Sequence, residues 1–373
     1  MRITGIDIDA VRVNHRGDWL FVHVNTDEGI WGLGELRPGN AYEGAVGAVR
    51  ALAERLKGTD PRRIREINEA CSQGNPGRDE VCALSAVEEA LWDLLGKSLG
   101  VPLHALFGGA LRDSIRLYAN INRATTDRTP EGFARNASAA VSEGFDAVKL
   151  APFDGLPRDV DRALDAETGI ACMRAVREAI GPDVDLLVDC HSRFTVKGAL
   201  EVADALRDLD LFWFEQPIPE TDLDDVVQVK ERCGIPIAGG EQRVFSSAFR
   251  EVMAQGAMDM VMPDVGIVGG IGELRKVADM ADAWGVATAP HGPFGPVELA
   301  AGIEAMAAQP GFLILEFAWG EVPWRSELTL PAEHIENGRV RLSDRPGLGL
   351  ELNPEVVEAH RVDLSGLQRR GQS

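Results

Sequence analysis

The sequence has no hydrophobic run that approaches the ~20 apolar residues of a membrane-spanning helix. Its five cysteines are scattered and include no Cys-x-x-Cys pair, so neither a disulfide framework nor a zinc site is expected. The first residues, Met1 to Thr4, lead directly into a strand-like pattern and contain no secretory signal. These absences predict a cytoplasmic protein with reduced cysteines and no membrane association.

Positive charge is also scarce, because 38 Lys and Arg face 59 Asp and Glu, for a formal net charge of −21. Such an excess argues against binding to nucleic acids or to anionic membrane surfaces. It does not exclude an anionic substrate, since a divalent cation can reverse the local potential. The 373 residues, 45% of them hydrophobic, suffice for one barrel-sized domain and a smaller partner.

The first third of the chain has the pattern of a separate α+β unit. Strands are predicted over Ile3–Val13, Leu20–Asn25 and Gly29–Glu35, from their alternating or β-rich sequences. From about Ala45 the apolar residues recur at helical spacing, and Gly100-Val101-Pro102 ends this helical region.

After Arg112 short apolar strands alternate with amphipathic helices. Eight strands are expected, at Ile115–Asn120, Ala147–Ala151, Leu186–Asp189, Phe212–Glu215, Ile237–Ala238, Met260–Met262, Ala287–Ala289 and Leu313–Glu316. Eight such β-α alternations predict a parallel sheet closed into a barrel. The expected division is a cap over residues 1–113, a barrel over 114–330 and a tail over 331–373 that returns to the cap.

Acidic or imidazole side chains end six consecutive barrel strands. They are Asp189, Glu215, Glu241, Asp264, His291 and Glu316. The intervals run from 23 residues (Glu241 to Asp264) to 27 (Asp264 to His291), about one β-α unit each. Because the carboxyl ends of barrel strands carry the catalytic residues, all six are expected to face one basin.

Three of these residues, Asp189, Glu215 and Glu241, supply the hard oxygen ligands that suit Mg²⁺. The alternative is that each is a solvated loop acid.

His291 and Asp264 lie on adjacent strands, where the carboxylate would orient the imidazole as a base. The alternative for His291 is that it only forms a hydrogen bond within a turn. His191 follows Asp189 by two residues on the same strand face and is a candidate general acid, or else an ordinary strand-end residue.

Several motifs resemble the enolase superfamily in its mandelate-racemase branch, over nearly the whole chain. They are EALWDLLGKSLGVPLHALFGG at Glu89–Gly109, FEQP at Phe214–Pro217, GGEQ at Gly239–Gln242, PDVGIVGG at Pro263–Gly270, APHGP at Ala289–Pro293 and LEF at Leu315–Phe317. The resemblance implies an α/β fold, a modified TIM barrel of (β/α)7β type with an N-terminal α+β capping domain. It also implies a homo-oligomer.

For the site, the resemblance implies Mg²⁺ held by Asp189, Glu215 and Glu241, and a His291–Asp264 pair as base. Glu316 would be the electrophilic partner at the substrate carboxylate. The cap would supply specificity loops near Asn14–Trp19 and Arg37–Glu43.

One departure from this branch concerns the Lys-x-Lys motif of its racemases. The chain has Val148-Lys149-Leu150-Ala151, so the first lysine is kept and the second is replaced by Ala151. A methyl group cannot exchange a proton. Asp189-Cys190-His191 instead is similar to the Asp-x-His of dehydratases that act on galactonate, gluconate and mannonate.

These features favour β-elimination of water from an acid sugar to a 2-keto-3-deoxy acid. Mg²⁺ would stabilise the enediolate, His291 would take the α-proton and His191 would protonate the leaving hydroxyl. Further polar residues are candidate contacts to the substrate, a small carboxylate, or equally ordinary polar groups. They are Lys149, Asn120, Asn122 and Arg193 in the barrel and His15, Arg16 and Trp19 in the cap.

Two other functions stay open. A racemase or epimerase of a 2-hydroxy acid would need a second base opposite His291, such as Lys149 or His191. A non-catalytic ligand-binding or metal-binding barrel would retain the fold without turnover. A cycloisomerase is disfavoured, because the resemblance implies paired lysines on strands two and six for that class, and strand six here ends in Asp264.

Overall fold

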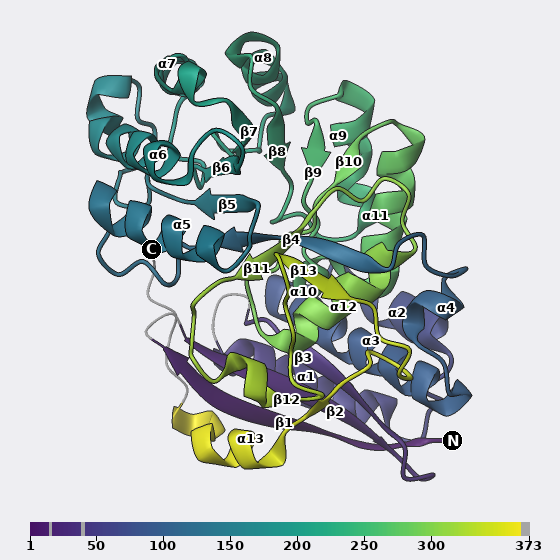
Figure 1. Cartoon of the computed structure of the whole chain (residues 1–373). Coiled ribbons are helices and arrows are strands. Elements are labelled where there is room, and N and C mark those ends of the chain that lie inside the picture. The colour runs from purple at the N-terminus through teal and green to yellow at the C-terminus, as the bar shows by residue number, and fades with distance from the viewer. Residues whose placement is uncertain (15–16, 39–41, 367–373) are drawn as a thin grey trace.

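The computed structural model describes residues 1–14, 17–38 and 42–366, and it divides into a cap and a barrel (Figure 1). The cap begins with a three-stranded antiparallel sheet in the order β1-β2-β3, formed by Ile3–Asn14, Gly17–Thr26 and Trp31–Leu36. The helical region that follows consists of several helices rather than one. They are α1 (Tyr42–Leu56), α2 (Ile64–Ser72), α3 (Arg78–Leu99) and the short α4 (Leu103–Leu106).

Eight parallel strands form the barrel, in the order β10-β9-β8-β7-β6-β5-β4-β11. They are β4 (Ser114–Asn120), β5 (Ala147–Leu150), β6 (Asp185–Asp189), β7 (Leu211–Glu215), β8 (Ile237–Gly239), β9 (Met260–Val261), β10 (Ala287–Thr288) and β11 (Leu315–Ala318). The circle closes where Thr288 of β10 pairs with the segment before β11, and the N–H of Leu313 donates to its carbonyl at 2.9 Å.

A helix follows each barrel strand except the last. They are α5 (Pro130–Ser142), α6 (Glu167–Ile180), α7 (Val196–Leu206), α8 (Leu223–Cys233), α9 (Arg250–Gln255), α11 (Ile271–Ala283) and α12 (Pro296–Ala307), with a short α10 (Val265–Val268) before α11. The (β/α)7β fold with an N-terminal cap is therefore confirmed. Among the described helices, none has the length and apolarity that a bilayer crossing requires.

The barrel strands are buried on both faces, which explains their nearly continuous apolar sequences. Inside the barrel, Tyr118 of β4 and Trp213 of β7 meet edge to face with ring centroids 5.3 Å apart. Both side chains are fully buried. They form an aromatic floor beneath the carboxyl ends of the strands.

The cap is attached to the barrel through buried carboxylates at helix N-termini. Glu88 of α3 accepts hydrogen bonds from the N–H groups of Ile271 (2.7 Å) and Gly272 (3.0 Å), at the start of α11. Glu35 of β3 accepts from the N–H groups of Gly295 (2.7 Å) and Glu298 (3.0 Å), at the start of α12. Backbone donors at a helix N-terminus favour such negative partners, so the cap is fixed above the barrel mouth.

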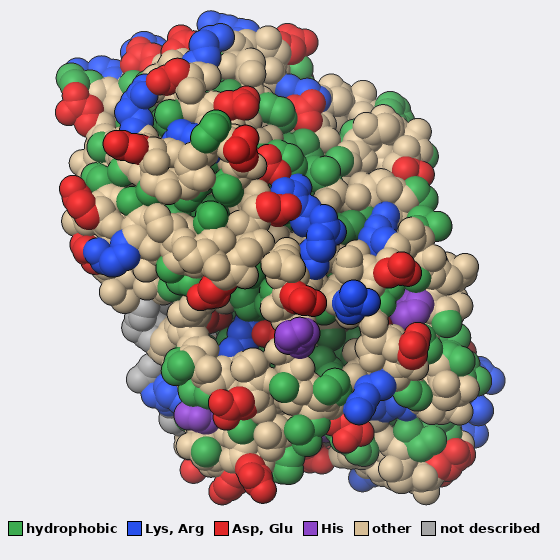
Figure 2. All heavy atoms as spheres, in the orientation of Figure 1, with side chains coloured by type: hydrophobic (Ala, Val, Ile, Leu, Met, Phe, Trp, Pro, Cys, Tyr) green, Lys and Arg blue, Asp and Glu red, His purple; other side chains and the backbone are tan. Residues whose placement is uncertain are grey.

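The tail contacts both units. Strand β13 (Arg339–Arg341) pairs with β4, and β12 (Thr329–Leu330) pairs with β14 (Glu351–Leu352). Helix α13 (Pro354–His360) then lies beside β1 (Figure 1). On the face in Figure 2 the acidic side chains are spread over the surface and interspersed with basic ones, so the net negative charge forms no single patch there.

Candidate active site

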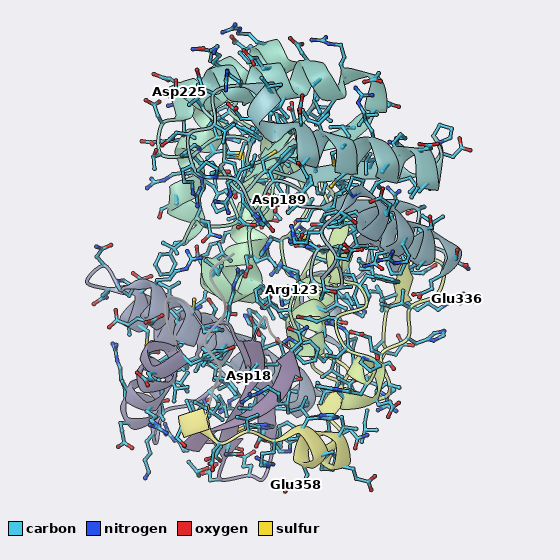
Figure 3. All side chains as sticks on the ribbon, turned by 90° about the vertical axis from the view of Figure 1, so that its left-hand side faces the viewer. Asp18, Arg123, Asp189, Asp225, Glu336 and Glu358 are labelled. Carbon is cyan, nitrogen blue, oxygen red and sulfur yellow. The ribbon has the colours of Figure 1, made fainter. Side chains whose placement is uncertain are left out.

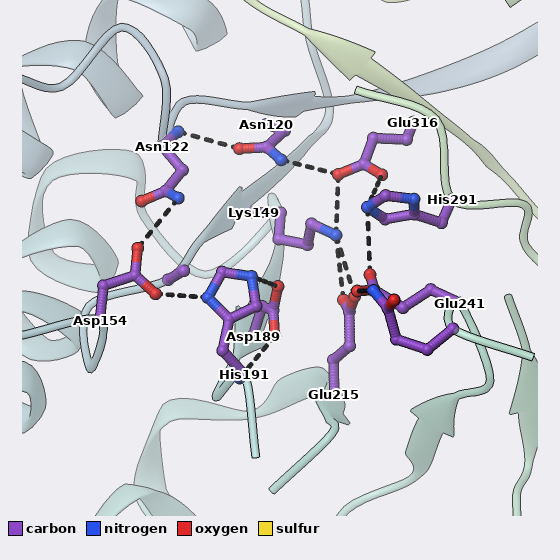
Figure 4. A network of polar contacts seen from close by, with 12 residues as sticks. Asn120, Asn122, Lys149, Asp154, Asp189, His191, Glu215, Glu241, His291 and Glu316 are labelled. Atoms are coloured by element: carbon purple, nitrogen blue, oxygen red, sulfur yellow. Dashed lines mark hydrogen bonds and ion pairs between the residues drawn. The ribbon is translucent and has the colours of Figure 1, made fainter. Parts of the chain in front are cut away.

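The structure brings the six predicted strand-end residues together at the carboxyl ends of the barrel strands, and Figure 4 shows all of them except Asp264 labelled. Asp189 and Glu215 end β6 and β7 and are register partners. Glu241, Asp264 and His291 lie two or three residues beyond β8, β9 and β10. Glu316 was expected at a strand end but is the second residue of β11, because that strand begins at Leu315. All six side chains are buried.

His291 forms a close pair with Asp264. Its Nδ1 lies 2.6 Å from Asp264 Oδ2, and its Nε2 lies 3.0 Å from Glu241 Oε2 and 3.7 Å from Glu316 Oε2. Arg37 of the cap also contacts Asp264, and its Nη1 is 3.3 Å from His291 Nδ1. Burial and the charge of Arg37 hold the pKa of His291 well below its usual range. A neutral imidazole in this position is able to accept a proton.

Lys149 of β5 lies at the centre of the site. Its Nζ is 2.8 Å from Glu316 Oε1 and 3.1 Å from both carboxylate oxygens of Glu215. Although burial opposes its charge, the negative charges of Glu215 and Glu316 raise its pKa well above the usual value. Asn120 also donates to Glu316 Oε1, at 2.7 Å. Lys149 is thus held between two carboxylates that favour its charged form.

The three carboxylates predicted to bind metal are buried and close in the fold. Burial and the negative charge of Asp189 raise the pKa of Glu215 well above its usual range and raise that of Glu241. Burial also opposes ionisation of Asp189, but the charge and hydrogen bonds of His191 hold its pKa below the usual value. Three buried carboxylates, two of which resist ionisation beside the charge of the third, are a set of oxygen donors that a divalent cation would stabilise.

The side chains do not enclose one point in this structure. Over residues 1–14, 17–38 and 42–366, no three His, Cys, Asp or Glu side chains gather closely enough to hold one ion. Asp189 instead faces His191, Glu215 faces Lys149 and Glu241 faces His291. The donor chemistry fits Mg²⁺, whereas each of the three carboxylates is turned toward a basic side chain, His191, Lys149 or His291.

His191 lies beyond β6, on the other side of Lys149 from His291 in Figure 4. Its Nε2 is 2.8 Å from Asp189 Oδ2, and its Nδ1 contacts Asp154. Although burial opposes a charged ring, Asp189 and Asp154 raise the pKa of His191 well above its usual value. Its backbone φ is +46°, a left-handed conformation that costs a residue other than glycine on the order of 1–3 kcal/mol.

A cavity of about 680 Å³ opens at this mouth. Its lining includes His191, Arg193, Gln216, Glu241 and Gln242. In Figure 3, Arg123 lies between Asp189 of the barrel, above it, and Asp18 of the cap strand β2, below it. The cavity is large enough for a small organic acid.

Of the other residues predicted to contact the substrate, some lie near the site and others do not. Asn122 is buried, donates to Asp154 at 3.3 Å and supports the loop after β5, while Arg193 lines the cavity. Trp19 differs from the expectation, because β2 directs it into the core, where its ring centroid is 5.7 Å from that of Trp324. His15 and Arg16 lie outside the described residues, as do residues 39–41 of the second predicted cap loop.

From the sequence, Asp154 is not expected at the site, and Arg37 is expected only as the first residue of a cap loop near the site, not as a contact of His291. Asp154 follows β5 by four residues and lies against His191, so its place after a strand end was an available signal. Arg37 reaches Asp264 from the cap, across 227 residues of sequence. No local pattern indicates such a contact.

Two family models match the chain. The model described as the enolase C-terminal domain-like family matches residues 132–356, and the mandelate racemase / muconate lactonizing enzyme N-terminal domain matches residues 8–108. The chain therefore belongs to the mandelate racemase / muconate lactonizing enzyme family of the enolase superfamily. The resemblance predicted from the motifs is confirmed.

Similar curated proteins include a D-xylonate dehydratase from Haloferax volcanii, 33% identical over 96% of this chain and 89% of its own length. A D-galactonate dehydratase from Variovorax paradoxus is 32% identical over 92% and 91% of the two chains. A D-galactarolactone cycloisomerase from Agrobacterium fabrum is also 32% identical, over 96% and 95%. The expected carbon–oxygen lyase class agrees with the first two names, while the third belongs to the class that the missing lysines disfavoured.

A solved structure with the same fold is a mandelate racemase/muconate lactonizing enzyme from Jannaschia sp. CCS1. It is 33% identical, with a TM-score of 0.89, and the match covers 97% of this chain and 98% of that one. The fold and cap are thus those of experimentally determined family members.

Proposed function

We propose that this chain is a Mg²⁺-dependent dehydratase that converts an acid sugar to a 2-keto-3-deoxy acid. The observation that carries the proposal is the presence of two imidazoles on separate strands, His291 beyond β10 and His191 beyond β6, on either side of Lys149. The position of a second catalytic lysine on β5 is occupied by Ala151. One base and one separate acid suit elimination better than two-sided racemisation. The names of the dehydratase relatives support the same class.

Asp189, Glu215 and Glu241 would hold the metal, in exchange for their present contacts with His191, Lys149 and His291. A bound Mg²⁺ supplies positive charge beside the substrate carboxylate, where negative charge develops as the α-proton leaves. Lys149 adds a second positive charge at the same place. The ion pairs of Lys149 with Glu215 and Glu316 fix this charge in advance, so little reorganisation is needed during the reaction.

His291 takes the proton from C2 through Nε2, because its Nδ1 is directed to Asp264. The electron pair of the C2–H bond forms the C2–C3 double bond, and the C3 hydroxyl leaves with a proton from His191 as water. The resulting enol takes a solvent proton at C3, releases the proton of its C2 hydroxyl and becomes the 2-keto-3-deoxy acid. Glu316 accepts hydrogen bonds from Asn120 and from the N–H of Gly292, and in this orientation it would lie beside the substrate carboxylate.

The far end of the substrate would lie in the mouth cavity, near Arg193. The homo-oligomer implied by the family remains a proposal, which the molar mass in light scattering tests.

A cycloisomerase is the second candidate, and the similarity to the D-galactarolactone cycloisomerase favours it. An isomerase retains every atom of its substrate. A dehydratase product is lighter by one water. The two activities are therefore separated by mass alone.

The proposal is tested by incubating the protein with Mg²⁺ and a panel of aldonates, aldarates and aldarolactones. Mass spectrometry of the products is expected to find an acid one water lighter than its parent, formed only when Mg²⁺ is present. A lactone converted without change of mass would indicate the cycloisomerase. The recovery of every acid unchanged, with no deuterium at C2 in deuterated water, would contradict both.

A further inference from the structure

Asp154 and His191 form a second carboxylate–imidazole pair at the barrel mouth. The first pair, Asp264 and His291, lies at the ends of β9 and β10. The second lies at the ends of β5 and β6, where Asp154 contacts Nδ1 of His191. Strands β7, β8 and β9 separate β6 from β10 in the sheet order. Each ring thus has a carboxylate on Nδ1 and presents Nε2 to the central carboxylates.

Asp154 is itself held in place. Its side chain is 7% exposed. One of its oxygens, Oδ2, accepts from Arg128 Nη2 at 2.9 Å and from Asn122 Nδ2 at 3.3 Å, while the other contacts His191. Arg128 also donates to Asn122 Oδ1 at 2.8 Å, which closes a small network. The carboxylate is therefore oriented by groups other than the histidine.

The backbone beneath the ring is also fixed. His191 and Ser192 both have left-handed φ angles, +46° and +56°, which residues with side chains rarely adopt. Arg158 donates to both of their carbonyl oxygens, at 2.9 and 3.0 Å. A strained conformation persists only where its surroundings determine it, and such strain gathers at functional sites. Arg158 therefore holds the backbone of His191, while Asp154 holds its ring.

We propose that Asp154 is a positioning residue, which fixes the ring of His191 so that Nε2 faces the leaving hydroxyl. The proposal rests on the elimination proposed above and assigns Asp154 no contact with the substrate. A carboxylate on Nδ1 sets the tautomer and orientation of the imidazole, and the opposite nitrogen then carries the transferred proton. Asp154 supports the acid as Asp264 supports the base.

The variant Asp154→Asn keeps the size of the side chain and removes its charge. Elimination is expected to fall by about 10²–10⁴-fold, while exchange of the α-proton with deuterated water continues at the wild-type rate, because His291 is unchanged. The matched control is Asp159→Asn, an exposed residue of the same loop, which should alter neither rate. A parallel fall in elimination and exchange, or no fall in either, would overturn the positioning role.

A second measurement needs no substrate. The proton shared by His191 Nδ1 and Asp154 should give a downfield resonance in the proton NMR spectrum of the wild-type protein. It should be missing from both Asp154→Asn and His191→Asn and retained in Asp159→Asn. A resonance that persists in Asp154→Asn, or is absent from the wild type, contradicts the pairing. If the wild type shows the resonance but dehydrates no acid sugar, the proposed function fails while the pairing stands.

Discussion

Nδ1 of His291 lies 2.6 Å from Oδ2 of Asp264, and the same carboxylate oxygen is contacted by Arg37 of the cap. Asp264 is therefore shared between His291, the proposed base, and a cation of the cap. Burial and the charge of Arg37 both lower the pKa of His291, which favours the neutral imidazole. The cap thus contributes to the base as well as covering the mouth.

The first prediction concerns this base. His291→Asn should abolish both water elimination and α-proton exchange, because Ala151 leaves no lysine to replace it. A loss of about 10²–10⁴-fold or more is expected from removal of a positioned base. Product mass and deuterium content at C2 measure the two rates. Exchange that continued near the wild-type rate would transfer the base role to His191 or Lys149.

The second prediction concerns the metal. Asp189→Ala, Glu215→Ala and Glu241→Ala should each weaken Mg²⁺ binding and remove turnover, because each deletes one hard oxygen donor. Isothermal titration with Mg²⁺ alone measures the binding. The matched control is Asp225→Ala, an exposed acid on α8, which should bind Mg²⁺ as the wild type does. Unchanged affinity in all three site variants would place the ion elsewhere.

The third prediction separates the two histidines. His191→Asn should reduce product formation by about 10²–10⁴-fold and still permit slow exchange of the α-proton, since His291 remains. If elimination and exchange are lost together while Mg²⁺ still binds, His191 is the base. If neither changes, His191 is an ordinary strand-end residue and the dehydratase proposal loses its acid.

The fourth prediction concerns stability and pH. Burial raises the pKa of Glu88 to about 7 from an ordinary 4.5, so the folded chain binds a proton that the unfolded chain has lost between these values. The contribution of Glu88 to the free energy of unfolding is full below pH 4.5 and decreases by up to about 3 kcal/mol as pH rises through 7. Glu88→Gln should remove this slope. Urea unfolding of both proteins from pH 5 to pH 8 measures it, and parallel pH profiles would contradict the shift.

The sequence allows the barrel and its ring of strand-end residues to be predicted, because both follow from local rules. Short apolar runs at regular intervals predict the parallel strands, and an acid such as Asp189 after each run predicts the basin. Contacts made by loops follow no such rule. Arg37 and Asp264 are 227 residues apart, and Asp154 meets His191 through the conformation of the loop after β5.

The placement of Trp19 illustrates a different limit. The sequence associates it with a polar cap loop, but the alternation of β2 turns its side chain toward the core. Side chains alternate between the two faces of a strand, so the direction of Trp19 follows once that residue belongs to the strand rather than to the loop before it. The structure begins β2 at Gly17, three residues earlier than the sequence pattern indicated.

The central claim is that proton removal at C2 leads to loss of the C3 hydroxyl. The most direct measurement is the reaction of the wild-type protein with Mg²⁺ and an accepted acid sugar in deuterated water, followed by mass spectrometry and proton NMR. Elimination predicts a 2-keto acid that lacks one water and carries deuterium at C3, where the enol took up a solvent proton. Recovered acid of unchanged composition with deuterium at C2, and no keto acid, would contradict the account and indicate a racemase or epimerase.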